Sequence, residues 1–157
     1  MDVLCAHAIV YGATGRTANQ RETLAAIGLF GATKPSPVTT PLADPFGPET
    51  LERRARSYLH ANCASCHQPN GGARGDLDLR FTTPLAQTGT CNASPATDTL
   101  DLTNAKIVSP GNPRESVLLA RMRASEGKRM PPLASRRIDD EGAALVEEWI
   151  RSLRSCE

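Results

Sequence analysis

The chain has 157 residues, 39% of them hydrophobic and only 4% aromatic, with a net charge of +1 at pH 7. This length fits one domain with an apolar core plus an irregular extension, and the low aromatic content leaves room in that core for a large flat cofactor. Basic and acidic residues are interspersed, which excludes recruitment to nucleic acid or anionic lipid, and no apolar run approaches the roughly 20 residues of a membrane-spanning helix.

The N-terminal part of the chain is expected to be an extension. Residues 1–12 lack the basic region and the cleavage site of a secretory signal, so we interpret the start as truncated or as a miscalled initiation codon. A short amphipathic helix is expected over 17–31. Five prolines follow between residues 33 and 48, and this stretch is expected to be irregular because proline removes backbone donors. We therefore predict an extension or linker over 1–48 and a domain over 49–157.

Three helices are expected in the domain. The first covers residues 49–62, since Pro48 suits a first helical turn and an apolar face follows it. The second begins at Asn112, a residue type that caps helices, and ends near residue 124. The third begins near Asp139, where acidic side chains favour the positive end of a helix dipole. Its apolar stripe is the strongest in the chain and consists of Leu145, Val146, Trp149, Ile150 and Leu153.

Loops are expected to fill the rest of the domain. Glycines in residues 68–76 indicate a loop after the first domain helix. The sequence LDLRF at 77–81 alternates apolar and polar residues, as a short extended segment does. Residues 82–103 show little periodicity, and residues 127–135 contain a proline pair that stiffens a loop. The predicted fold class is therefore all-α with long irregular loops.

One motif points to a specific chemistry. Residues 63–67 have the sequence Cys-Ala-Ser-Cys-His, the C-x-x-C-H signature of covalent haem attachment. Two cysteines three positions apart at the end of a helix can reach both vinyl groups of one porphyrin as thioethers. The imidazole of His67 can then bind the iron, since neutral imidazole is a good iron ligand. We therefore expect one covalent haem c on Cys63 and Cys66, with His67 as a metal ligand.

Other uses of this motif fit the sequence less well. A zinc-binding interaction module would need a second C-x-x-C or paired histidines at a workable spacing, and the sequence has neither. A thioredoxin-like redox pair would need a surrounding βαβ pattern.

The second axial ligand of the iron has several candidates. Met130 lies beside two prolines, and a stiff loop holds a soft thioether against iron at low entropic cost. Met122 is better explained as a core residue of a helix. His60 lies too close in sequence to His67 to cross to the opposite haem face, and His7 falls in the uncertain start. We expect Met130 to ligate the iron together with the motif histidine.

Two further side chains have an expected place. Arg80 follows the haem loop, and its guanidinium can pair with a haem propionate, although most arginines are simply solvated. Trp149 is expected to be a core residue that packs against the helix ending at Cys63.

Three cysteines lie outside the motif: Cys5, Cys91 and Cys156. One disulfide and one free thiol among them would suit an oxidising compartment, and all three pairings are open. Since covalent haem attachment generally takes place outside the cytoplasm, we expect a periplasmic or otherwise exported protein, even though this chain carries no signal peptide.

The domain resembles the class I cytochrome c fold. A helix leading into ANCASCH, then PGNPRES before a second helix, RMPPLAS, and a final helix with EEWIRSL carry this resemblance over about residues 49–154. It implies crossed N- and C-terminal helices around one haem, with Met130 as the distal ligand. The insertion 82–104, which contains Cys91, departs from a minimal member.

More narrowly, RARSYLHANCASCHQPNGG, LDLRF and PGNPRESVLLARM resemble the C-terminal haem domain of a family of exported bacterial c-type cytochromes. Those proteins are usually longer, which implies that residues 13–48 are the remnant of an upstream segment. We expect an electron carrier rather than an enzyme, with redox proteins as partners: an exported dehydrogenase, other cytochromes or an oxidase. The chief alternative is a haem-containing fragment of a larger oxidoreductase, or a peroxidase-like enzyme with an open distal site.

Overall fold

The chain separates into two compact units, Met1–Leu42 and Ala43–Glu157. The predicted boundary between residues 48 and 49 lies inside the second unit. None of the helices in the described part of the chain is long and apolar enough to cross a membrane. The computed structural model describes residues 8–11, 16–31, 41–125, 127–133 and 137–157.

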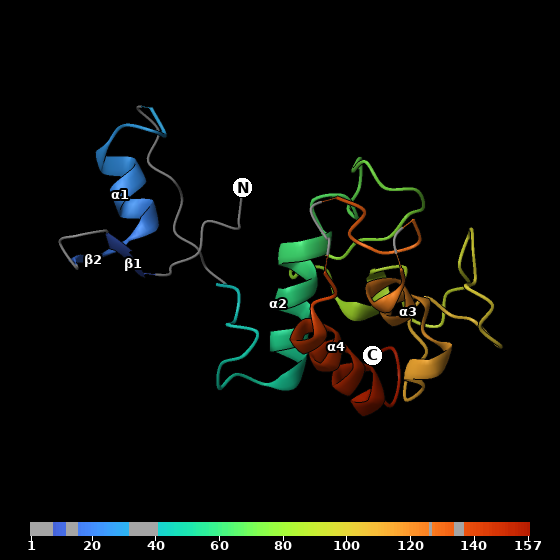
Figure 1. Ribbon diagram of the computed structural model, residues 1–157. Helices are drawn as coiled ribbons and strands as arrows, with labels where there is room; N and C mark the ends of the chain where they lie inside the picture. The colour runs from blue at the N-terminus through green and yellow to red at the C-terminus, as the bar shows by residue number, and fades with distance from the viewer. Residues whose placement is uncertain (1–7, 12–15, 32–40, 126, 134–136) are drawn as a thin grey trace. The chain divides into compact units, whose positions relative to one another are not determined.

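The first unit contains a short hairpin and one helix (Figure 1). Strand β1 (Ala8–Tyr11) pairs antiparallel with β2 (Arg16–Asn19), and α1 (Gln20–Ala26) follows directly. The hairpin is absent from the sequence-based prediction, and the helix expected over 17–31 is shorter than predicted. It ends early because Gly28 adopts a left-handed backbone conformation (φ 77°), which terminates a helix.

The described residues of the second unit contain helices, turns and isolated bridges, in agreement with the all-α prediction. Its first helix, α2 (Leu51–Cys63), lies within a residue or two of the predicted helix 49–62. Thr50 rather than Pro48 marks its start, because the Thr50 hydroxyl accepts a hydrogen bond from the Arg53 backbone N–H at 3.4 Å. This bond satisfies one of the free donors at the helix N-terminus, so Pro48 precedes the helix.

The helix predicted over 112–124 is interrupted. Pro113–Glu115 forms a single 3-10 turn, and α3 (Val117–Arg123) begins only after Ser116. The buried Ser116 hydroxyl accepts from the Ser109 N–H at 2.9 Å and donates to the Asn112 carbonyl at 3.0 Å. These tertiary bonds hold Ser116 in an extended conformation, which explains the break.

The last helix, α4 (Asp140–Ser152), begins where the acidic residues predict. Asp139 caps it by accepting from the Gly142 N–H at 2.9 Å, and the second Asp139 oxygen accepts from the Tyr58 hydroxyl at 2.8 Å. Burial and this hydrogen bond raise the pKa of Tyr58 well above its ordinary value. The cap of α4 is therefore joined to a side chain of α2.

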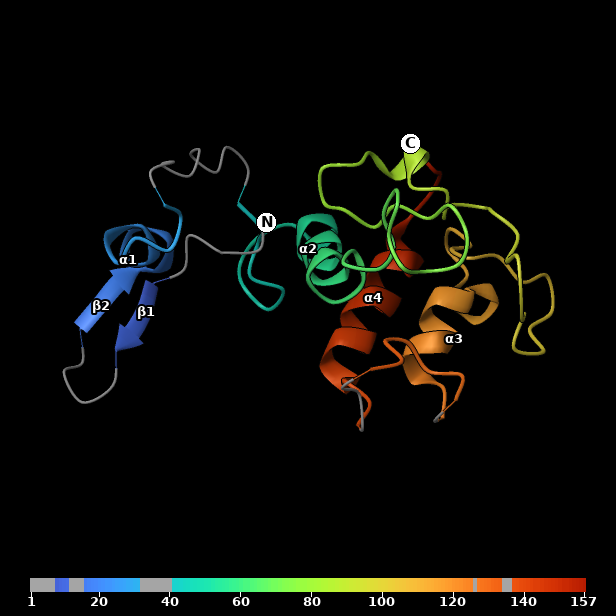
Figure 2. The same ribbon diagram turned by 90° about the horizontal axis from the view of Figure 1, so that it is seen from above.

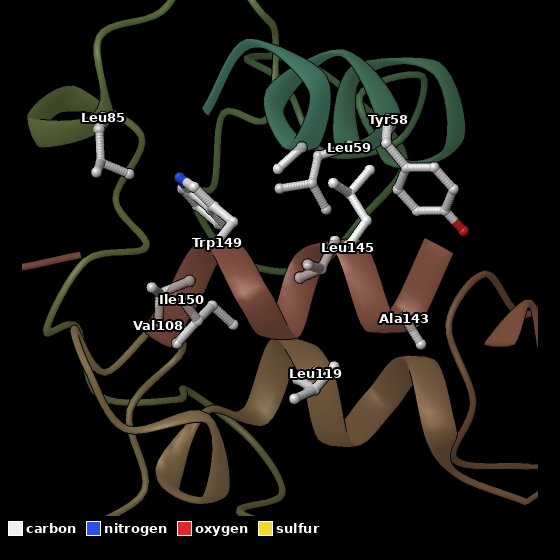
Figure 3. Packing of buried hydrophobic residues seen from close by; sticks show 11 residues of the cluster. Tyr58, Leu59, Leu85, Val108, Leu119, Ala143, Leu145, Trp149 and Ile150 are labelled. Carbon is white, nitrogen blue, oxygen red and sulfur yellow. The ribbon is translucent and has the colours of Figure 1, made fainter. Parts of the chain in front are cut away.

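Helix α4 lies between α2 and α3, and Figures 2 and 3 show this order from two directions. The crossing with α2 is close, because a Cβ atom at Gly142 would overlap the Tyr58 ring. The predicted crossing of the N- and C-terminal domain helices is thus confirmed. Trp149, only 2% exposed, lies in the buried cluster as predicted. That cluster consists of Ala55, Tyr58, Leu59, Leu85, Val108, Leu119, Ala143, Leu145, Val146, Trp149 and Ile150.

The insertion 82–104 is largely irregular, as predicted, apart from a 3-10 turn at Leu85–Gln87. Of the three possible cysteine pairings, the structure contains Cys91–Cys156, which joins the insertion to the chain end after α4 across a sequence separation of 65. Cys91 also forms a parallel bridge with buried Val108. The insertion is therefore attached to the core both covalently and by backbone hydrogen bonds. Cys5 lies outside the described residues.

Candidate haem-attachment site

The end of α2 brings the two motif cysteines and the histidine into one turn. The backbone N–H groups of Cys66 and His67 both donate to the Cys63 carbonyl, at 3.1 and 2.9 Å. The following loop folds back on this turn, since Ala73 N–H donates to the Cys66 carbonyl at 3.2 Å. A Cβ atom at Gly71 would overlap that carbonyl, so only glycine permits this close approach.

The motif side chains carry the functional groups that haem attachment requires, two thiols and an imidazole. Among the described cysteines, Cys63 and Cys66 are free thiols, whereas Cys91 and Cys156 are oxidised to a disulfide. Burial, and to a smaller degree the neighbouring Cys66, raise the pKa of Cys63 to about 11.

Burial lowers the pKa of His67, which favours the neutral imidazole. Its Nδ1 atom is buried with no hydrogen-bond partner among the described residues. Two reduced thiols and a neutral imidazole in one turn fit a covalently bound haem. In the described part of the chain no group of three or more His, Cys, Asp or Glu side chains gathers as a metal site.

The predicted extended segment 77–81 runs along α2 and forms no strand within the described residues. Leu79 N–H donates to the His67 carbonyl at 2.9 Å, and Phe81 N–H donates to His60 Nδ1 at 2.9 Å. The buried Arg56 guanidinium donates to the Arg80 carbonyl at 3.1 Å and to the Thr83 carbonyl. Two side chains of α2 therefore hold this segment next to the motif histidine.

Arg80 forms an ion pair with Asp78. The Arg80 Nε and Nη2 atoms donate to the Asp78 carboxylate at 2.9 and 2.6 Å, and the Thr83 hydroxyl donates to it at 2.8 Å. The Arg80 hydrogen bonds hold the pKa of the largely buried Asp78 well below its ordinary value. Arg80 thus already uses one edge of its guanidinium, and its pairing with a haem propionate stays a prediction.

Met130 lies in the loop after α3, and its side chain is 37% exposed. Its N–H donates to the Arg121 carbonyl at 3.0 Å, and Arg121 Nη1 donates to the Lys128 carbonyl at 3.0 Å. Met122 packs against the core cluster, as predicted. The remaining candidate ligand, His7, lies outside the described residues.

Sequence reasoning missed Arg56, Asp78 and Arg121. One signal was available for Arg56, a charged residue between apolar positions on the buried face of a predicted helix. The Asp78 and Arg80 side chains share one side of an extended segment because they are two residues apart. The role of Arg121 has no local sequence signal, since its loop contacts depend on tertiary structure.

A family model described as cytochrome c matches residues 52–154, which is well over half of the chain. No curated protein and no solved structure matches the chain. The matched residues include the Cys-Ala-Ser-Cys-His motif, all of α3 and α4, and the loop that contains Met130.

Proposed function

Since this chain belongs to the cytochrome c family, it is an electron-transfer domain with covalently bound haem c, and we propose that one haem is joined to Cys63 and Cys66 with its iron held by His67 and Met130. When bound, the haem supplies an iron atom that gains or loses one electron. The chain's own contribution is to hold the ligands and to set the polarity around them.

The geometry of the turn that ends α2 carries this proposal. The Cys66 and His67 N–H groups both donate to the Cys63 carbonyl, at 3.1 and 2.9 Å, so two thiols and an imidazole lie within one turn. Two cysteines at this spacing can each form a thioether with a vinyl group of one porphyrin, and the adjacent imidazole can bind its iron.

Two observations favour Met130 as the second ligand. It belongs to a loop that is hydrogen-bonded to α3 at two points, and the competing Met122 packs against the core. Thioether ligation raises the reduction potential relative to two histidines. We therefore assign the domain to the oxidising part of an electron-transfer chain.

The proposed role of Arg80 is to bind a haem propionate through the guanidinium edge that Asp78 does not use. The proposed location is the periplasm, which the disulfide supports because such bonds persist in oxidising compartments. The proposed partners are an exported dehydrogenase as electron donor and another cytochrome or an oxidase as acceptor. We propose that the domain acts as an electron carrier.

Absorption spectra of protein matured by a periplasmic haem-attachment system test the ligand assignment. We expect ferric wild type to show the weak far-red band of methionine-ligated iron, and Met130→Ala to lose it and bind carbon monoxide when reduced. Met122→Ala is the matched control and keeps the band. A band that persists in Met130→Ala places the ligand elsewhere, and wild type that lacks the band and reacts with peroxide favours a peroxidase-like enzyme.

A further inference from the structure

We propose that Arg121 is a positioning residue that holds the Met130 loop in place, with Asp98 of the insertion as an outer support. This inference rests on the proposed ligation of iron by Met130. It concerns how often the thioether leaves the iron, a property that the identity of the ligand does not determine.

Arg121 contacts the loop through both its backbone and its side chain. Its carbonyl accepts from the Met130 N–H at 3.0 Å, and its Nη1 atom donates to the Lys128 carbonyl at 3.0 Å. The two bonds fix loop positions two residues apart, one on each side of Arg129. A guanidinium is suited to this task because its planar donor group makes charge-assisted hydrogen bonds of defined direction.

Helix α3, which carries Arg121, is packed into the domain. It is anchored by buried Val117 and Leu119, and it packs against α4. Helix α4 in turn crosses α2, whose last residue is Cys63. Arg121 therefore links the Met130 loop to the packed helices that also position the attachment motif.

Asp98 supports the same loop from the insertion. Its Oδ2 atom pairs with Lys128 Nζ at 3.4 Å, and its Oδ1 atom accepts from the Leu100 N–H at 2.8 Å. The Asp98 carboxylate also experiences the positive charge of Arg121. Because the Asp98 and Lys128 side chains are 42% and 55% exposed, salt screens this pair and its contribution is the smaller one.

Loss of the Arg121 side chain should increase the fraction of molecules in which Met130 is off the iron. An external ligand that competes with Met130 then binds more tightly in proportion to that fraction. We expect Arg121→Ala to raise the imidazole affinity of the ferric holoprotein by roughly fivefold, the effect of losing one charge-assisted hydrogen bond at an exposed site. Arg121→Lys, which retains the charge and a donor, should restore part of the wild-type value.

Arg123→Ala is the matched control. It removes the same charge from the same helix and breaks the pair with Glu147, so it reports general loosening of α3. We expect imidazole affinity close to wild type. If Arg123→Ala raises the affinity as much as Arg121→Ala does, the effect is one of helix stability and the positioning role is refuted.

Met130→Ala separates this inference from the ligand assignment. If Met130→Ala binds imidazole no better than wild type, the proposed ligation is wrong. If Met130→Ala binds it much more tightly while both Arg121 variants match wild type, only the positioning role is wrong. Asp98→Asn should raise the affinity less than Arg121→Ala, and its effect should disappear at high salt. Should Arg121→Ala fail to mature, Arg121→Lys and Arg121→Gln supply the same comparison.

Discussion

The crossing of α2 and α4 provides a sharp test of the packing, through the substitution Gly142→Ala. Gly142 lies in the first turn of α4 against the Tyr58 ring, and an added Cβ would overlap that ring. Tyr58 cannot simply turn aside, because it is 8% exposed and its hydroxyl donates to Asp139. The new methyl group must therefore push the two helices apart or break that hydrogen bond.

Two opposing effects decide the magnitude. Alanine favours a helix over glycine by roughly 1 kcal/mol. Overpacking of a close contact costs about 1–3 kcal/mol, and loss of a hydrogen bond to a carboxylate costs about 1.5–3 kcal/mol. We expect Gly142→Ala to lower the free energy of unfolding by about 1 kcal/mol net. In a Tyr58→Leu background, which lacks the overlapping ring atoms, the same change should instead stabilise by up to about 1 kcal/mol.

Guanidinium unfolding of the four holoproteins, followed by circular dichroism, measures both values. The difference between the two backgrounds is the coupling of the residue pair. Gly142→Ala that is neutral or stabilising in the wild-type background would contradict the close crossing. An equal destabilisation in both backgrounds would show that the loss arises elsewhere than at the Tyr58 ring.

Three further predictions follow from the second unit. The pKa of Asp78 is lower in the folded state than its ordinary 3.8, so the ionised carboxylate stabilises the fold above that pH and this stabilisation is lost as the pH falls below it. Asp78→Asn should therefore be about 2 kcal/mol less stable than wild type at pH 7. Unfolding curves should show a smaller difference in stability between the two proteins at pH 3 than at pH 7. The double change Cys91→Ser/Cys156→Ser should lower the unfolding free energy by about 2–4 kcal/mol. A reductant should lower the midpoint of denaturant unfolding of the wild type while the haem stays attached. An unchanged midpoint would contradict a structural disulfide. Arg56→Met should loosen the segment 77–81, because the guanidinium donates to the Arg80 and Thr83 carbonyls. Hydrogen exchange at the Leu79 and Phe81 amides should therefore be faster in the variant. Equal protection of these amides in both proteins would refute this role of Arg56.

Several expectations about element boundaries and strands failed because a side-chain hydrogen bond or a partner strand decided them. The prediction of one helix over 112–124 was wrong because Ser116 bonds with Ser109, a residue of the preceding segment. The hairpin of β1 and β2 was missed because pairing between strands depends on a partner rather than on one segment's pattern. Pro48 was placed inside the first turn of α2, although the hydroxyl of Thr50 supplies the cap.

By itself, the sequence determined the features that depend on near neighbours. Cys63, Cys66 and His67 lie within five residues, so one helical turn suffices to bring them together, and the apolar stripe of α4 follows from helical periodicity. Only the tertiary structure decided which cysteine pairs with Cys91 and what anchors the loop of Met130. These contacts depend on how folded segments pack against one another, and one-dimensional spacing carries no record of that packing.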